Sequence, residues 1–253
     1  MNQQPVSQQT TGIKTRIACA FRTYFLPGLI IQIIGLSVVL SYYYIPAVKS
    51  LLEVVAGWKT TYGYWYSGAS HALFAAFIPF IYMSFDPKTK GRMTFGYLIF
   101  SLLLWAQKGV EVDALYRLQG YVFGSAPSVR IVAIKLFFDQ FVYAAFWGLP
   151  TVMALVMWRD NGYRFSALRD SYRSGEMKEK FVASLFSCWI VWIPTVSIIY
   201  CMPPMLQLPL CSIIGCFWIL ILTRLIRDDS PTPQPDELFQ NESLTDGAQQ
   251  PTL

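Results

Sequence analysis

The chain has 253 residues, of which 54% are apolar and only 14% are charged, and its mean hydropathy is +0.40. A soluble domain normally carries about 25% charged residues, so the composition argues against a soluble globular protein. The basic residues behind the formal net charge of +5 are split among separate segments. This distribution argues against nucleic acid as a partner.

Long stretches with few charges predict six transmembrane helices. About 20 apolar residues in an α-helix cross a hydrocarbon core of roughly 30 Å. The predicted spans are residues 24–48, 67–85, 93–107, 131–158, 181–200 and 208–223. The third segment and the last pair are short, so they could instead be half-spans or re-entrant hairpins, which would leave four spans. The predicted fold class is therefore an all-α, multi-pass transmembrane helical bundle with four to six spans.

Polar segments flank the predicted transmembrane domain, which covers residues 24–227. Residues 1–23 contain no acidic residue, and we interpret them as a disordered lead-in, with a weak mitochondrial targeting segment as the alternative. Residues 228–253 are rich in Pro, Gln and acidic residues. That composition is typical of a disordered tail.

The positions of Lys and Arg predict an orientation. If the N-terminus lies inside, most basic residues fall in inner segments, and the outer loops contain only Lys49, Lys59, Lys108, Arg117 and Arg130. The positive-inside rule then predicts both termini on the cytoplasmic or matrix side of a bacterial cytoplasmic membrane or an organelle inner membrane. The expected partners are the lipid bilayer and its anionic headgroups. A homo-oligomer is compatible with the sequence.

No catalytic site, metal site or cofactor site is predicted. The five cysteines have no Cys-x-x-Cys spacing, and reduced thiols that pack as small apolar groups explain them best. The sequence has no G-x-S-x-G, H-E-x-x-H or P-loop motif. An enzyme would require His71, Glu111 and Asp139 to converge on one cavity.

Asp139 is the most informative polar residue because it lies within an apolar helix. A carboxylate at membrane depth costs about 2.5–3.5 kcal/mol on insertion scales, so it needs a partner or water. Lys135 lies four residues earlier on the same predicted face and can pair with it. Two interpretations stay open: a polar lining point of a pore, extended by Gln140 and Tyr143, or a local ion pair near the interface. Pro150 is expected to bend this helix.

Other residues predict contacts between helices. His71 is either a titratable lining residue or, as we favour, a packed histidine bonded to a neighbouring helix. Small residues predict close helix approach at Ser67, Gly68, Ala69 and Ser70, and at Gly28 and Gly35. The Tyr and Trp clusters at residues 42–44 and 58–66 are typical of an interfacial aromatic belt, which we favour over a ligand cage.

Three short motifs occur in order in the second half of the chain. The first contains Lys135, Asp139 and Gln140, and the second is Leu168-Arg169-Asp170-Ser171-Tyr172. The third consists of aromatic residues and prolines: Trp189, Trp192, Pro194, Tyr200, Pro203, Pro209 and Trp218. Together they resemble the K…DQ element, the L-R-x-x-Y stretch and the C-terminal W-P signature of the Mpv-seventeen family, also called the 22-kilodalton peroxisomal membrane protein family. A weaker likeness through Arg92, Gly96 and Tyr116 extends the resemblance to residues 67–225.

The chain departs from the family pattern at specific positions. Ile199-Tyr200 replaces the family's N-F pair, and residues 205–207 lack its arginine. Members are usually drawn with four spans. The resemblance implies a small helical protein of inner mitochondrial, peroxisomal or related membranes, a family in which some members are proposed to be weakly selective channels. It implies no enzymatic activity.

Two functions are compatible with these features. The leading hypothesis is a passive channel or transport-type protein for small polar or anionic solutes, with Asp139 as a polar or gating element. Residues 194–209, where Pro203-Pro204 is expected to force a turn, would form a break beside the pathway. The alternative is a non-transporting membrane organiser or scaffold that binds partners or lipids through its helix faces and the basic loop 159–180.

Overall fold

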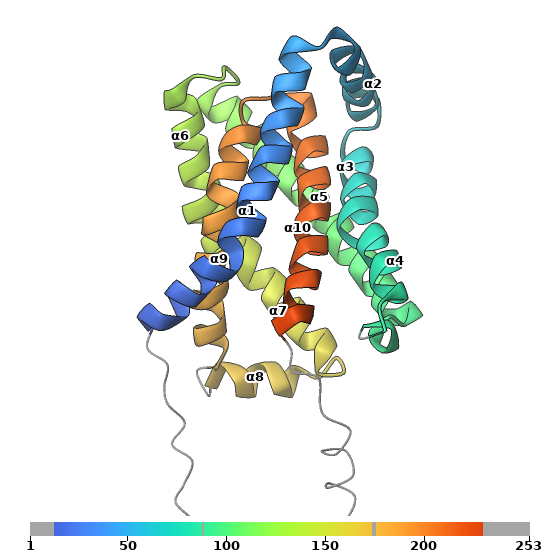
Figure 1. The fold of residues 1–253 in the computed structure, drawn as a ribbon, viewed down its shortest axis with the longest axis vertical. Helices are drawn as coiled ribbons and strands as arrows, with labels where there is room; N and C mark the ends of the chain where they lie inside the picture. The colour runs from blue at the N-terminus through green and yellow to red at the C-terminus, as the bar shows by residue number, and fades with distance from the viewer. Residues whose placement is uncertain (1–12, 88, 174–175, 230–253) are drawn as a thin grey trace, which may run out of the picture.

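The structure is a computed structural model that describes residues 13–87, 89–173 and 176–229. Every regular element in these residues is helical, and long helices run side by side along the long axis (Figure 1). The predicted all-α class is therefore confirmed. Within the same residues, three helical stretches are long and apolar enough to cross a membrane: Phe25–Tyr44, Tyr64–Phe85 and Val129–Asp160.

The first helix, α1 (Ile13–Tyr44), begins inside the predicted polar lead and contacts the last two helices, α9 and α10. The next helix, α2 (Pro46–Tyr62), lies at one end of the bundle, where the sequence predicted an outer loop (Figure 1). A proline in the first helical turn has no backbone N–H to leave unpaired and restricts the preceding residue to an extended conformation. Pro46 thereby ends α1 and starts α2, with Ile45 extended between them.

The chain then returns through α3 (Tyr64–His71), a π-helical segment (Ala72–Phe77) and α4 (Ile78–Phe85). A similar series forms the fourth long stretch: α6 (Val129–Phe137), a π-helical segment (Phe138–Gly148) and α7 (Leu149–Asp160). Each π-helical segment ends just before a proline, Pro79 or Pro150. A proline has no N–H for the carbonyl four residues earlier and clashes with it, so the helix widens there. The sequence predicted a bend at Pro150, and the structure has a widened π-helical turn immediately before it.

Between these two stretches lies α5 (Phe95–Phe123), which begins at the N-cap Thr94. The sequence predicted that this span ends at residue 107, but the helix continues for about four more turns. The added part contains Lys108, Asp113 and Arg117. A charged residue marks the end of an apolar helix only when its side chain faces water. These three side chains are instead paired with other side chains of the bundle.

The last elements are α8 (Phe165–Arg173), which lies across the other end of the bundle, α9 (Glu176–Ile199) and α10 (Pro204–Asp229). The turn predicted at Pro203-Pro204 is confirmed, since α9 ends at Ile199 and α10 begins at Pro204. The start of α1 and the end of α10 lie at the same end of the molecule (Figure 1). Most of the predicted tail, residues 230–253, lies outside the described residues.

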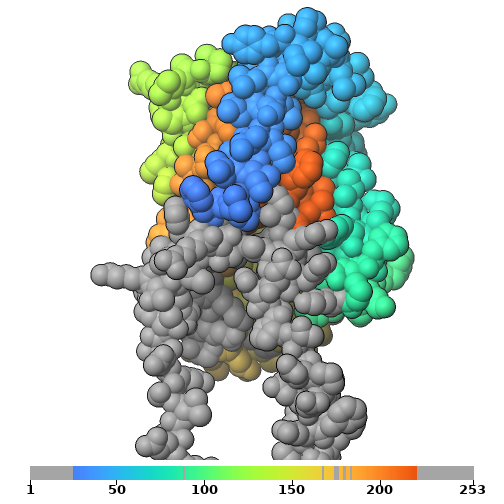
Figure 2. Space-filling model, in the orientation of Figure 1, coloured from blue at the N-terminus to red at the C-terminus, as the bar shows by residue number. Residues whose placement is uncertain are grey.

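The apolar core lies where α1, α9 and α10 meet, and α1 covers the other two on the face shown in Figure 2. The predicted close approach at the glycines of α1 is confirmed. A Cβ at Gly35 would lie 3.1 Å from Ile214 Cδ1, and one at Gly28 would lie 3.4 Å from Val191 Cγ2. Small residues thus allow this helix to pack closely against its neighbours.

Candidate functional site

Polar side chains on α5 extend into the interior of the bundle. Lys108, Asp113 and Gln119 are each at most 4% exposed. At a rise of 1.5 Å per residue, these residues cover about 16 Å along the helix axis. Each belongs to a separate cluster of hydrogen bonds that joins α5 to other helices.

The first cluster surrounds Asp113 near the end of the bundle that α2 covers. Lys59 of α2 is 1% exposed and donates to the Asp113 carboxylate and to Ser67 Oγ, the latter at 2.8 Å. Ser67 Oγ lies 2.8 Å from Asp113 Oδ2, and Arg117 Nε donates to the same oxygen at 3.2 Å. One carboxylate is therefore shared by two cations. Burial lowers the pKa of Lys59, while the hydrogen bond and charge of Asp113 oppose this shift.

This cluster opens into a cavity of about 320 Å³. Its wall includes Lys59, Asp113, Arg117, Ser125 and Gln207. The cavity contains two cationic groups and one anionic group, so the residues around it carry an excess of positive charge. Such a cavity can hold water or a small anion.

The second cluster surrounds Asp139, which is 6% exposed. Its carboxylate accepts hydrogen bonds from Gln140 Nε2 at 2.7 Å and from the Tyr200 hydroxyl at 2.9 Å. The Tyr200 oxygen also lies 2.9 Å from Gln119 Oε1. A hydroxyl has one hydrogen, and the oxygen and nitrogen of a glutamine amide can be exchanged by a flip. With Gln119 flipped, its N–H donates to Tyr200, Tyr200 donates to Asp139, and the otherwise unpaired Gln119 nitrogen gains a partner.

Of the two interpretations of Asp139, the local ion pair with Lys135 is not observed. No ion pair of the described residues joins them, and Lys135 Nζ instead lies 5.5 Å from the centroid of the Tyr200 ring. The π-helical segment begins at Phe138, so the helix contains more residues per turn from that point. The four-residue spacing then no longer stacks the two side chains on one face, and Asp139 pairs with a residue of α9.

Two of the sequence motifs meet at this cluster. Trp189 Nε1 donates to the Gln140 carbonyl oxygen at 3.1 Å, and the Trp189 ring packs against Phe141 with centroids 4.9 Å apart. Lys135, Asp139, Gln140, Trp189 and Tyr200 therefore lie together although they were predicted from separate motifs.

The remaining motif residues lie elsewhere. Trp192 and Trp218 pack against the apolar core. Pro194 is exposed, Pro209 is buried, and Pro203 lies in the turn between α9 and α10. Arg169 is exposed on α8, where it approaches Asp170 at 3.7 Å. The structure therefore does not bring these six residues to the Asp139 cluster.

The third cluster lies between α5 and the stretch from Phe138 to Asp160. Lys108 Nζ donates to Thr151 Oγ1 at 2.6 Å and to Glu111 Oε2 at 3.0 Å. The Tyr143 hydroxyl donates to Glu111 Oε1 at 2.7 Å. Glu111 and Asp139 thus bind different partners. Within the described part of the chain, no three His, Cys, Asp or Glu side chains group as metal ligands would.

His71 bonds to a neighbouring helix, as we favoured from the sequence. Its Nδ1 lies 2.7 Å from Ser212 Oγ of α10, and Ser212 donates to the Leu208 carbonyl. Behind His71, α3 packs closely against α5, because a Cβ at Gly109 would lie 2.6 Å from His71 Cβ. This confirms the close helix contact predicted around residues 67–70.

A second polar cavity, of about 760 Å³, lies near the other end of the bundle. Its wall includes Arg92, Arg159 and Asp160, with an ion pair of 2.8 Å between Arg159 and Asp160. The Arg159 guanidinium also lies 4.4 Å from the Tyr97 ring centroid. Here too, two cations face one anion.

Lys59, Lys108, Asp113 and Arg117 are the site residues that sequence reasoning missed. It placed the three basic ones in outer loops because they lie beyond the apolar segments. A signal was present in α5, because Lys108 precedes Glu111 by three residues and Asp113 precedes Arg117 by four, and opposite charges at these spacings are typical of a helix. The distant pairing of Lys59 with Asp113 has no such local signal.

No protein-family model, curated protein or solved structure matches the chain.

Proposed function

We propose that the protein is a six-span membrane protein that gives small polar or anionic solutes a pathway across the bilayer. The observation that supports this most is the series of buried ionisable groups inside the bundle, between two polar cavities. Ionisable side chains within membrane helices usually face the bundle interior or water and often mark substrate or ion pathways. Under this proposal, the functional site is the interior of the bundle.

The proposed spans are α1, α3–α4, α5, α6–α7, α9 and α10. Three of these include the stretches that satisfy the length and hydropathy needed for a membrane helix. The helix α5 has too many charges to qualify by composition, but its buried charges are paired. Because Lys108 lies within α5, it no longer counts as an outer-loop charge, which strengthens the excess of basic residues on the side proposed to hold both termini.

Charge supports a preference for anions. The wall of each polar cavity has two cations and one anion: Lys59, Arg117 and Asp113 at one end, and Arg92, Arg159 and Asp160 at the other. A cleft with one sign of excess charge raises the local concentration of ions of the opposite sign. We therefore expect chloride and small organic anions to pass faster than sodium.

Asp139 and Tyr200 are the proposed gate. Their hydrogen bond joins the stretch from Phe138 to α9, and Gln119 extends the connection to α5. The Tyr200 ring also contacts Tyr116, with centroids 5.3 Å apart, and Tyr116 lines the cavity beside Asp113. Movement of Tyr200 would therefore displace Tyr116 in the cavity wall. The hydrogen bond from Tyr200 to Asp139 would keep the proposed gate closed.

A liposome assay tests this function. Purified protein is reconstituted, and the efflux of chloride and of sodium is measured with matched gradients. Wild-type protein should release chloride faster than protein-free liposomes do, and faster than it releases sodium. Arg117→Gln should lower the preference for chloride, whereas Lys49→Gln, an exposed lysine paired with Glu53 on α2, should leave it unchanged. Asp139→Asn should change the selectivity or gating, and liposomes that stay tight across pH and voltage would contradict the proposal.

The contact between Gln140 and Trp189 supports the proposed relationship to the Mpv-seventeen family. It joins the K…DQ element to the W-P signature, so two of the three motifs lie in contact in this chain. Under this proposal the membrane is a mitochondrial inner, peroxisomal or bacterial cytoplasmic membrane.

The surface of α8 favours a second candidate function, a membrane organiser. This short helix exposes Phe165 and Tyr172, which are 73% and 76% exposed, next to Arg169 and Arg173. A helix with apolar and basic residues on its surface binds at anionic membrane interfaces. If wild-type liposomes do not leak, and Arg169→Gln with Arg173→Gln removes co-purified anionic lipid without impairing insertion, the organiser function is favoured.

A further inference from the structure

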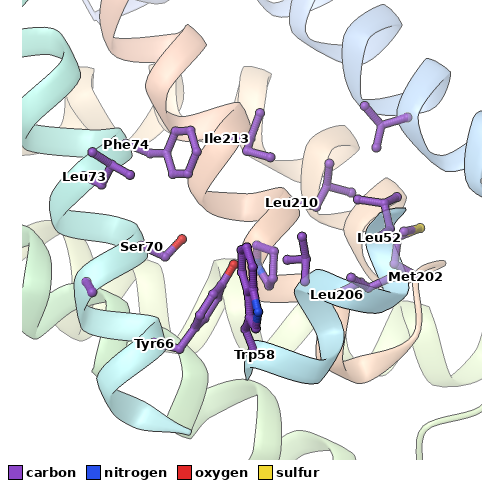
Figure 3. A pocket seen from close by; sticks show the side chains of 14 residues that line it. Leu52, Trp58, Tyr66, Ser70, Leu73, Phe74, Met202, Leu206, Leu210 and Ile213 are labelled. Carbon is purple, nitrogen blue, oxygen red and sulfur yellow. The ribbon is translucent and has the colours of Figure 1, made fainter. Parts of the chain in front are cut away.

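An apolar pocket of about 400 Å³ lies between α1, α2, α3 and α10 (Figure 3). Its volume is within the range of small-molecule sites, about 300–1,000 Å³. No charged side chain contributes to its wall, and none of its lining residues lines the two charged cavities described above. It is therefore separate from the proposed solute pathway.

Ser70 is a buried hydroxyl in the wall of this pocket. It is 7% exposed, and the hydroxyl group near enough to bond with its Oγ is that of Tyr66, one turn away in the same wall. Other helical serines of this chain donate to the carbonyl four residues earlier, as Ser84 and Ser212 do at 2.7 and 3.0 Å. The Ser70 hydroxyl instead points into the pocket (Figure 3). Two hydroxyls that have only each other as partners leave hydrogen-bonding capacity unused in an apolar wall, and a ligand oxygen would use it.

Two aromatic residues with polar atoms lie beside this hydroxyl. Figure 3 shows Trp58 and Tyr66 side by side at the pocket, with the Tyr66 hydroxyl directed into the space that Ser70 faces. The indole N–H can only donate, and both hydroxyls can donate or accept. The polar part of the pocket therefore suits an uncharged oxygen, such as a hydroxyl or a carbonyl. The remaining wall, formed by residues such as Leu73, Phe74 and Leu210, suits a hydrocarbon.

The pocket lies at the level expected for a lipid headgroup. Trp58 is 54% exposed at its edge, and the adjoining Tyr44, Tyr62 and Trp65 are 79%, 60% and 86% exposed. Exposed Tyr and Trp residues of membrane helices gather where hydrocarbon meets headgroups. A lipid could thus enter from the bilayer with its oxygen near this boundary and its chain between the helices.

We propose that this pocket binds a neutral lipid headed by a single hydrogen-bonding oxygen, with the oxygen at Ser70 and Tyr66. A long-chain alcohol and a sterol share this chemistry. A fatty acid or phospholipid would place a charge where the wall offers no counter-charge. The site would be occupied whether or not the protein conducts solutes.

Photolabelling of the full chain in detergent tests the site. The probe is a long-chain alcohol with a diazirine close to its hydroxyl, and labelled positions are mapped by mass spectrometry. Labelling should fall on residues 58–74 and be competed by hexadecanol or cholesterol, whichever better matches the pocket. Hexadecane, which lacks the oxygen, and palmitate should compete about two- to ten-fold more weakly, as expected for one lost hydrogen bond.

Variants separate the pocket from general lipid contact. Ala69→Trp should fill the pocket and abolish labelling of this segment. Ser70→Ala, which removes only a hydroxyl, should weaken binding about two- to ten-fold. Ser84→Ala is the matched control, because its hydroxyl is bonded within its own helix, and it should bind as the wild type does. Labelling that is unchanged in Ser70→Ala, or equally strong competition by hexadecane and palmitate, would overturn the proposal.

Discussion

Removal of the Asp113 charge should strongly destabilise the bundle. Asp113→Asn keeps the shape of the side chain but leaves the Lys59 ammonium, which is 1% exposed, without an anionic partner. Breaking a buried ion pair by removing one partner typically costs about 3–5 kcal/mol, because the remaining charge stays buried and uncompensated.

The residues around Lys59 and Asp113 place the expected cost near the lower end of this 3–5 kcal/mol range, about 3 kcal/mol. After the change, Lys59 still has Ser67 Oγ at 2.8 Å and the Gly63 carbonyl at 3.5 Å, both neutral acceptors. Arg117 also loses a partner, but its side chain is 42% exposed and can turn to water, which adds less than about 1 kcal/mol. We therefore expect a loss of about 3 kcal/mol in the free energy of unfolding.

Thiol labelling provides the assay. Cys211 and Cys216 are each 6% exposed, whereas Cys201 is exposed. A reagent that fluoresces on reaction with thiols therefore reports unfolding, during a denaturant titration in detergent, as an increase over the signal of the thiols that already react in the folded protein. Glu53→Gln is the control, since its pair with Lys49 is solvent-exposed and should contribute less than about 0.5 kcal/mol.

A double-mutant cycle shows whether the pair itself is responsible. Lys59→Met in the Asp113→Asn background removes the stranded charge and should recover part of the lost stability. The reasoning is refuted if Asp113→Asn changes stability by less than about 0.5 kcal/mol, or if the two substitutions are additive.

Two further changes test helix packing and the proposed gate. Gly109→Ala places a Cβ 2.6 Å from His71 Cβ and should lower the free energy of unfolding by about 1–3 kcal/mol. Gly57→Ala on α2, where nothing lies within 4 Å, should raise it by about 0.4–1 kcal/mol. The thiol assay measures both changes. Tyr200→Phe removes a donor to Asp139 and should lower stability by about 1–3 kcal/mol while raising chloride efflux, and unchanged efflux would count against this gate.

The sequence predicted those features that depend on local spacing and composition. The helical class, the turn at Pro203-Pro204 and the bonded histidine at position 71 follow from hydropathy, backbone restrictions and small neighbouring residues. The burial of Asp139 and its need for a partner also followed from the cost of a charge at membrane depth.

The identity of buried partners could not be predicted in the same way. Asp139 pairs with Tyr200, which is 61 residues away, and Lys59 reaches Asp113 across 54 residues. Nothing in a single sequence marks such pairs. The interpretation that paired Lys135 with Asp139 assumed an α-helical spacing, whereas the helix is π-helical from Phe138.

The extent of α5 and the existence of α2 were missed for one shared reason. Charges were read as loop residues, although Lys59 and Lys108 are buried with partners. A charged residue ends a span only where water is the better environment. Inside a bundle, a paired charge can continue the helix.

Accessibility of position 139 to water tests the proposed pathway most directly. Asp139→Cys is placed in a chain without other cysteines, reconstituted in liposomes and treated with a small anionic methanethiosulfonate. The reagent should modify Cys at position 139, and the modification should change chloride efflux. If this thiol stays unreactive while Arg130→Cys, at an exposed site at the start of α6, reacts fully, no water-filled path passes the Asp139 cluster.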